Sequence, residues 1–193
     1  MIKTIFFSGV VILFSSIAYS QSIRFGIDPG IALSKGSYKP DAGIDRRIFA
    51  GFDGGVLVEI GVTPKFMIQP EANYSIVGVE LNNGIDEFTI KHTYVNVPLL
   101  AKFNVANRFN LMAGPQMGFL LSSRSDPSSG EAATDIKDQF KSTDFGLTFG
   151  AEYKFTRHTF LGTRYYLGVA NISDNSNFEM KNRYVSFRVG YIF

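Results

Sequence analysis

Cysteine and tryptophan are both absent from this chain of 193 residues. Without cysteine the protein can form neither a disulfide framework nor a lipid-modified N-terminal cysteine, so a lipoprotein anchor is excluded. Beyond the first twenty residues there is no run of 18 or more apolar residues, which excludes a membrane-spanning helix. An excess of one charge is lacking too, because 19 Lys and Arg stand against 17 Asp and Glu. We therefore expect no nucleic-acid partner.

The first twenty residues have the three parts of a secretory signal peptide. Lys3 supplies a positive charge, residues 5–17 are an apolar stretch, and Ala18 and Ser20 occupy the positions that a signal peptidase reads. The apolar stretch is too short to cross the hydrocarbon core as a helix, which takes roughly 20 residues. We therefore expect residues 1–20 to be a cleaved secretory signal peptide and residues 21–193 to form one exported domain.

After the signal, apolar residues alternate with small or polar ones, which is the pattern of β-strands. In residues 144–155 the odd positions carry Phe, Leu, Ala and Tyr, and the even positions carry Gly, Thr and charged residues. Glycine weakens a strand and an exposed face does not need it, whereas the narrow interior of a small barrel does. The pattern therefore favours a polar face that points into a barrel and an apolar face that meets lipid.

Eight such segments are predicted, each about as long as the 9–11 residues that a tilted strand needs to cross a bilayer, or slightly longer. They are residues 23–34, 49–60, 65–76, 92–103, 108–121, 144–155, 159–171 and 183–193. Short connections alternate with long polar ones, as in outer-membrane barrels. The sequence thus predicts an all-β fold, an eight-stranded antiparallel up-and-down transmembrane β-barrel with periplasmic termini. The expected surface loops are residues 35–48, 77–91, 123–143 and 172–182.

The last segment ends on an aromatic residue, with apolar residues at alternate positions before it. Phe187, Val189, Tyr191 and Phe193 share one face and resemble the C-terminal signal that outer-membrane assembly machinery reads. A soluble β-protein would more often end in fraying polar residues. We therefore expect an outer-membrane location, with outer-membrane lipids and the barrel-assembly machinery as partners.

Five stretches carry a resemblance to a known family. They are Ile68–Tyr74, Val97–Phe103, Phe109–Phe119, Thr163–Gly168 and Gly190–Phe193. Together they resemble the PorT-like outer-membrane β-barrel domain family of Bacteroidota, over nearly all of the chain after the signal. The resemblance implies a barrel scaffold. Some members of that family are implicated in a secretion system, so an accessory role in protein secretion is one implied function.

Three prolines, Pro70, Pro98 and Pro115, fall inside predicted strands. Each lacks the N–H that a paired strand would use, so each removes a ladder hydrogen bond. We expect a bulge beside each proline to accommodate it.

Seven charged residues share the inward faces of the predicted strands. They are Glu59, Glu71, Lys102, Glu152, Lys154, Arg164 and Arg188. They could form a charged pore or a proton path, or a network of paired charges, because unpaired charges in so narrow a space are very costly. Eight strands enclose an interior only just wide enough for side chains, so we favour a lumen charge network that plugs the barrel.

Ser75 and His92 form the one candidate catalytic pair. They share the inward face of neighbouring strands near the outer rim, and Glu80 or Glu87 could orient the histidine, as a surface esterase or lipid A deacylase requires. No strained nucleophile turn surrounds Ser75, and a rim histidine that faces solvent is the more common arrangement. We expect no enzyme activity and keep this pair as an alternative.

Three functions from different classes remain open. The favoured one is a non-enzymatic membrane barrel whose loops serve surface interaction or envelope integrity, through a surface or envelope protein partner. The alternatives are an outer-membrane esterase or deacylase and a soluble periplasmic lipocalin-like binding barrel, which would need an apolar interior. No cofactor and no metal are expected, because the acidic residues of the loop 123–143 do not match the spacing of a calcium loop.

Overall fold

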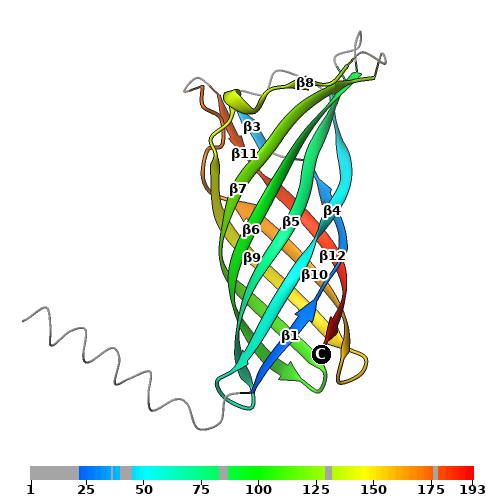
Figure 1. The fold of residues 1–193 in the computed structure, drawn as a ribbon, viewed down its shortest axis with the longest axis vertical. Helices are drawn as coiled ribbons and strands as arrows, with labels where there is room; N and C mark the ends of the chain where they lie inside the picture. The colour runs from blue at the N-terminus through cyan, green and yellow to red at the C-terminus, as the bar shows by residue number, and fades with distance from the viewer. Residues whose placement is uncertain (1–21, 36, 40–44, 83–86, 129–131, 176–177) are drawn as a thin grey trace, which may run out of the picture.

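The alternating segments form strands that ring a barrel (Figure 1). A computed structural model describes residues 22–35, 37–39, 45–82, 87–128, 132–175 and 178–193. The predicted signal peptide lies outside the described residues, so its cleavage stays a prediction. None of the described residues forms a helix both long enough and apolar enough to cross a membrane.

Eight strand positions make up the wall. The strands of the wall are β1 (Ile23–Ile27) with β2 (Gly30–Ser34), β4 (Asp45–Gly61), β5 (Phe66–Asn82), β6 (Glu87–Ala106), β7 (Phe109–Pro127), β9 (Thr143–Lys154), β10 (Thr159–Gly168) and β12 (Arg183–Ile192). Strands β1 and β2 share one position, separated by Asp28 and Pro29. Strand β12 pairs with both of them and closes the barrel, and every pairing is antiparallel. The prediction of an eight-stranded antiparallel barrel is confirmed.

Short elements gather at the end opposite the C-terminus (Figure 1). Strand β3 (Ser37–Lys39) pairs with β11 (Glu179–Lys181), and β8 (Thr134–Asp135) pairs with β7. A 3-10 helix, η1 (Lys137–Gln139), follows β8. The described chain starts and ends at the other end, in agreement with the expectation that both termini share one side.

The strands at this elaborated end are longer than predicted. Residues 77–82 and 87–91 continue β5 and β6, and the partners Asn82 and Glu87 lie at the tip of this hairpin. The prediction of a surface loop over residues 77–91 is therefore wrong for all but its tip. The reason is that the alternation continues but its faces are exchanged: Val77, Val79 and Leu81 point inward and are buried, and polar residues stand outward. The pattern of a lipid-facing strand therefore ends although the backbone ladder goes on.

The prolines are accommodated without the bulges that we expected. Register shifts lie between Ile48 and Asp53, between Thr93 and Tyr94, and between Asn104 and Ala106, away from every strand proline. Where β6 faces β7, the partners skip Leu99 and Leu100 and resume in the same register. The prediction is wrong because the residues on either side of the gap are paired continuously and hold the register across the missing N–H.

The barrel is apolar outside and largely polar inside. Large apolar side chains stand exposed along the outer wall, including Phe187, Val189 and Tyr191 of β12 and Phe193 directly after it. Charged and amide side chains are buried within. This is the inverse of a lipocalin-like protein, whose cavity would be apolar, and it is the arrangement that contact with lipid requires.

The interior is not polar throughout. Leu57, Phe160 and Ile192 form a buried apolar cluster, and a β-carbon on Gly190 would lie 1.9 Å from Cζ of Phe160. Glycine at this position therefore makes room for an aromatic ring inside the barrel, a detail that the alternation did not predict.

Candidate functional site

A first ion cluster is centred on Lys102, whose side chain is fully buried. Its Nζ lies 2.6 Å from Glu59 Oε1 and 2.6 Å from Glu152 Oε2, and it donates to Gln69 Oε1 at 3.0 Å. Lys154 Nζ reaches Glu59 at 3.1 Å, and Arg24 reaches the same carboxylate at 2.7 Å from the rim. The lysine thus has three acceptors, which is the full capacity of an ammonium group.

A second cluster lies further along the axis, with two arginines among three carboxylates. Arg188 donates to Asp53 Oδ2 from Nε at 3.1 Å and to Asp28 Oδ2 from Nη1 at 3.0 Å. Arg164 Nη1 donates to both oxygens of Glu71, and its Nη2 lies 3.2 Å from Asp28. Both guanidinium groups are buried, so these charges depend on each other rather than on water.

The structure brings all seven charged residues of the predicted network into these two clusters. Sequence reasoning missed Arg24, Asp28 and Asp53, which complete them. Parity could have found all three: Asp53 shares the face of Glu59, and Arg24 and Asp28 share the inward face of Gly26, two positions away on either side. Together the clusters hold five carboxylates and five cations, so they balance in charge.

Above the ion clusters an aromatic layer crosses the interior. Tyr94, Tyr166 and Tyr184 are buried with small apolar side chains from neighbouring strands, and the rings of Tyr166 and Tyr184 lie 5.0 Å apart. The Tyr184 hydroxyl accepts a hydrogen bond from Gln116 Nε2 at 3.0 Å. The interior is therefore filled at three levels by side chains, as expected for a barrel of this size.

Ser75 and His92 are both buried, but no hydrogen bond joins them. The Ser75 hydroxyl donates to Asp53 Oδ1 at 2.5 Å and accepts from Asn96 Nδ2 at 2.8 Å. His92 Nδ1 lies 3.0 Å from Ser123 Oγ, and its ring meets Phe140 edge-on at 4.6 Å. The hydroxyl of Ser75 is thus engaged in the ion cluster, with no solvent exposure for a substrate to reach it.

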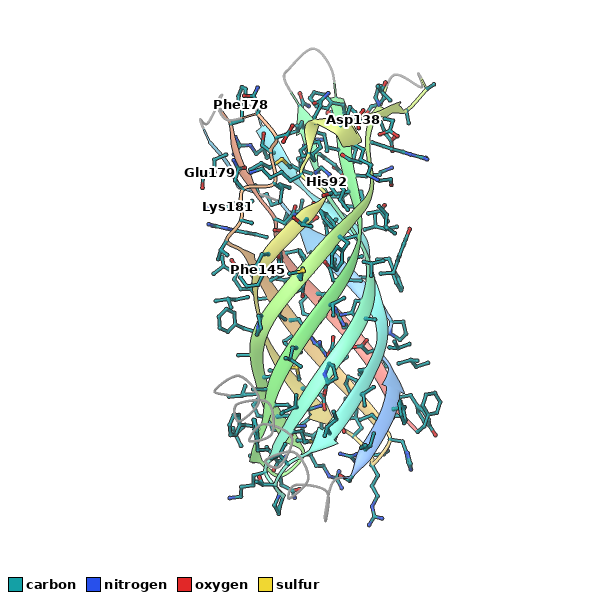
Figure 2. The ribbon with its side chains drawn as sticks, turned by 60° about the vertical axis from the view of Figure 1, so that its left-hand side comes forward. His92, Asp138, Phe145, Phe178, Glu179 and Lys181 are labelled. Carbon is teal, nitrogen blue, oxygen red and sulfur yellow. The ribbon has the colours of Figure 1, made fainter. Side chains whose placement is uncertain are left out.

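Residues 137–141 cross the mouth of the barrel instead of extending into solvent. Phe140 forms an isolated bridge with Ser173, Lys141 N donates to Ile172 O at 2.8 Å, and Asp174 N donates to the carbonyl of Gln139. In Figure 2, Asp138 lies at the top of the barrel with His92 below it. The connection between β8 and β9 therefore has a fixed place against the connection between β10 and β11.

These two connections enclose a cavity of about 520 Å³ at the surface. Its apolar part includes Ile90, Phe140, Phe178 and Met180. Its charged lining residues are Asp138, Asp174 and Glu179, with no Lys or Arg among the lining residues that the structure describes. Lys181 lies 2.5 Å from Glu179 (Figure 2 labels both). The volume falls within the usual range for small-ligand sites, and its charge favours a cation.

Among the residues with a described position, no group of three or more His, Asp or Glu could hold a metal ion. The expectation of no metal and no cofactor stays a prediction.

Comparison with known proteins gives one family and several solved structures of similar fold. The family model described as "Outer membrane protein beta-barrel domain" matches residues 19–174. Neisserial surface protein A has 13% identity, with 87% of this chain and 95% of that chain covered and a TM-score of 0.52. The Yersinia pestis attachment invasion locus protein Ail, in complex with the heparin analogue sucrose octasulfate, has 13% identity, with 89% and 99% covered and a TM-score of 0.50. No curated protein matches the sequence.

Proposed function

The chain belongs to the family of outer membrane protein β-barrel domains, and from this we propose a non-enzymatic integral barrel with a closed interior and a binding surface at its extracellular end. The observation that carries the proposal is the contrast between the two parts of the molecule. The bore is filled by balanced ion clusters and an aromatic layer, while the mouth carries a folded pocket. A filled interior with a pocket at the mouth supports binding of a partner at the surface as the function.

A closed bore supports a role other than solute passage. We expect the Arg164→Ala variant to lose roughly 10 °C in unfolding temperature, because Glu71 and Asp28 lose a buried partner. Its permeability should stay at the level of the wild type, since the tyrosine layer still fills the interior above the gap. Liposome swelling with small sugars measures permeability, and heating in detergent measures stability. A clear gain in swelling rate would overturn the closed interior.

The pocket at the mouth favours a cationic partner with apolar groups, such as a basic segment of a surface or envelope protein. Two of its carboxylates, Asp138 and Asp174, have no side-chain partner among the described residues. Phe140 and Phe178 offer ring surfaces to a cation. Ail was solved with a sulfated heparin analogue, which is a polyanion. The acidic lining of this pocket leads us to propose the opposite charge preference here.

A peptide pair tests this preference. Barrels in proteoliposomes should bind a labelled peptide of alternating Lys and Phe, and not one of alternating Glu and Phe. Replacing Asp138 and Asp174 together by Asn should weaken binding about tenfold, as expected for the loss of charge-assisted hydrogen bonds. The control replaces Asp126 and Asp135 by Asn, which removes the same charge outside the pocket. Equal losses in both double variants would contradict a site in the pocket, and anisotropy of the label gives the affinities.

The narrower assignments stay predictions. We retain the PorT-like subgroup from the five sequence stretches, and an accessory role in protein secretion as what that resemblance implies. We do not propose an esterase or deacylase, because the partners of Ser75 and His92 support structural roles for both. Binding to the assembly machinery through Phe187, Val189, Tyr191 and Phe193 is likewise a proposal. It is supported by their exposure on the closing strand.

A further inference from the structure

The outer wall carries an apolar groove of about 400 Å³ where β2, β4, β10 and β12 meet. Leu33, Ile48, Tyr165, Val185 and Phe187 line most of it. All five alternate with inward residues of their strands, so their side chains face away from the bore. The groove is thus open to whatever surrounds the barrel, which for a membrane barrel is lipid.

Two cations stand at the extracellular end of this groove. Lys35 and Arg183 both line it, and both are exposed. Ser34 and Tyr184 are partners in the antiparallel ladder; Lys35 comes directly after Ser34 and Arg183 directly before Tyr184. Lys35 and Arg183 therefore face each other across neighbouring strands, and Lys35 N lies 3.4 Å from Arg183 O. Like charges that face each other across a strand pair repel. A bound anion between them would remove that cost.

Neither cation has a protein counter-ion in the described part of the chain. Ion pairs elsewhere on the surface, such as Lys91 with Asp126 and Arg47 with Glu87, do have acidic partners. Lys35 and Arg183 have no ion pair and no side-chain hydrogen bond with a described residue. Their position is where the apolar surface of β2 and β12 ends, the level at which lipid head groups lie.

We propose that this groove binds a phosphate-bearing lipid of the outer leaflet. One acyl chain lies along Leu33, Tyr165 and Phe187, and the phosphate lies between the Lys35 ammonium and the Arg183 guanidinium. Free phosphate would bind the two cations but leave the apolar groove empty. A zwitterionic head group would place its own ammonium beside Lys35 and Arg183, which repel it. The proposal requires the barrel to lie in a bilayer with its loops outward, and it is independent of the pocket at the mouth.

The absence of tryptophan permits a direct test, because one introduced indole is the only one in the protein. The Tyr165→Trp variant reports on the groove. The Tyr74→Trp variant makes the same change on the outer face of β5, across the barrel. Each is reconstituted in phosphatidylcholine with increasing brominated phosphatidic acid, and quenching yields the binding of that lipid relative to phosphatidylcholine.

We expect the groove reporter to show about tenfold preference for phosphatidic acid, and the β5 reporter to show none. Adding Lys35→Gln and Arg183→Gln should abolish the preference, and Arg183→Lys should retain it. Millimolar inorganic phosphate should leave it unchanged, whereas loss in phosphate would mean a free-anion site and overturn the lipid proposal. Equal preference at both reporters would also overturn it. Absence of quenching by brominated phosphatidylcholine at both would contradict membrane insertion itself, and the groove with it.

Discussion

The Arg188→Met variant should lose roughly 3–5 kcal/mol of unfolding free energy, the cost of removing one partner from a buried ion cluster. Arg188 contacts Asp28, Asp53 and Glu71 and is buried. Without it Asp28 and Glu71 keep one arginine, Arg164, and Asp53 keeps only the hydrogen bond from Ser75 among the described residues. Methionine fills much of the volume, so the loss reports mainly on charge. Urea titration of the barrel in lipid vesicles, followed by tyrosine fluorescence, measures it.

A matched control lies at the rim where the described chain starts and ends. Arg24→Met also removes an arginine from a carboxylate, Glu59, but the Arg24 side chain is 38% exposed. Lys102 and Lys154 remain beside Glu59, so we expect a loss of about 0–1 kcal/mol. Equal effects of the two substitutions would mean that the second cluster is hydrated and that the bore is more open than the packing indicates.

The Leu147→Arg variant should lose about 2–4 kcal/mol for a different reason. Leu147 lies near the middle of the apolar outer face of β9, between Phe145 and Phe149, and all three are exposed. An arginine there meets hydrocarbon with no partner for its charge. The same urea titration in lipid vesicles measures the loss.

Thr143→Arg is the control for this experiment. Thr143 is on the same outward face of β9 and begins that strand, at the end nearest the barrel mouth, where the cost of arginine should fall to about 0–1 kcal/mol. In a soluble barrel both substitutions would be mild, because both side chains would meet water. A large loss for Leu147→Arg with little change for Thr143→Arg therefore tests the membrane-facing surface directly.

Together these experiments separate the roles of the two faces. The charges on the inward face compensate each other, so removing one leaves a buried charge without a partner and should cost much stability. On the outward face, the cost of a charged substitution arises from contact with lipid, so it should disappear where the same face meets water. The pocket lies at the mouth and the groove on the outer wall, outside the ion clusters, so we expect substitutions there to change binding with small effects on stability.

The sequence by itself determined the strand count, the inside-out arrangement and most of the inward charges. Alternation is a local property, and it assigns a residue such as Glu152 or Phe149 to a face without knowledge of its neighbours. It did not determine which strands continue beyond the membrane, because in residues 77–82 and 87–91 the apolar side chains stand on the inward face and the polar ones on the outward face, the reverse of a lipid-facing strand.

Only the tertiary structure decided which residues meet. Parity places Arg188 inside, but the closure of the barrel brings it to Asp53, 135 positions away in the chain. The same closure sets Lys35 beside Arg183 on the outer wall, and the folded mouth brings Phe140 onto His92. The physical reason is that a face follows from one strand alone, whereas height along the axis follows from the register of every strand pair around the ring.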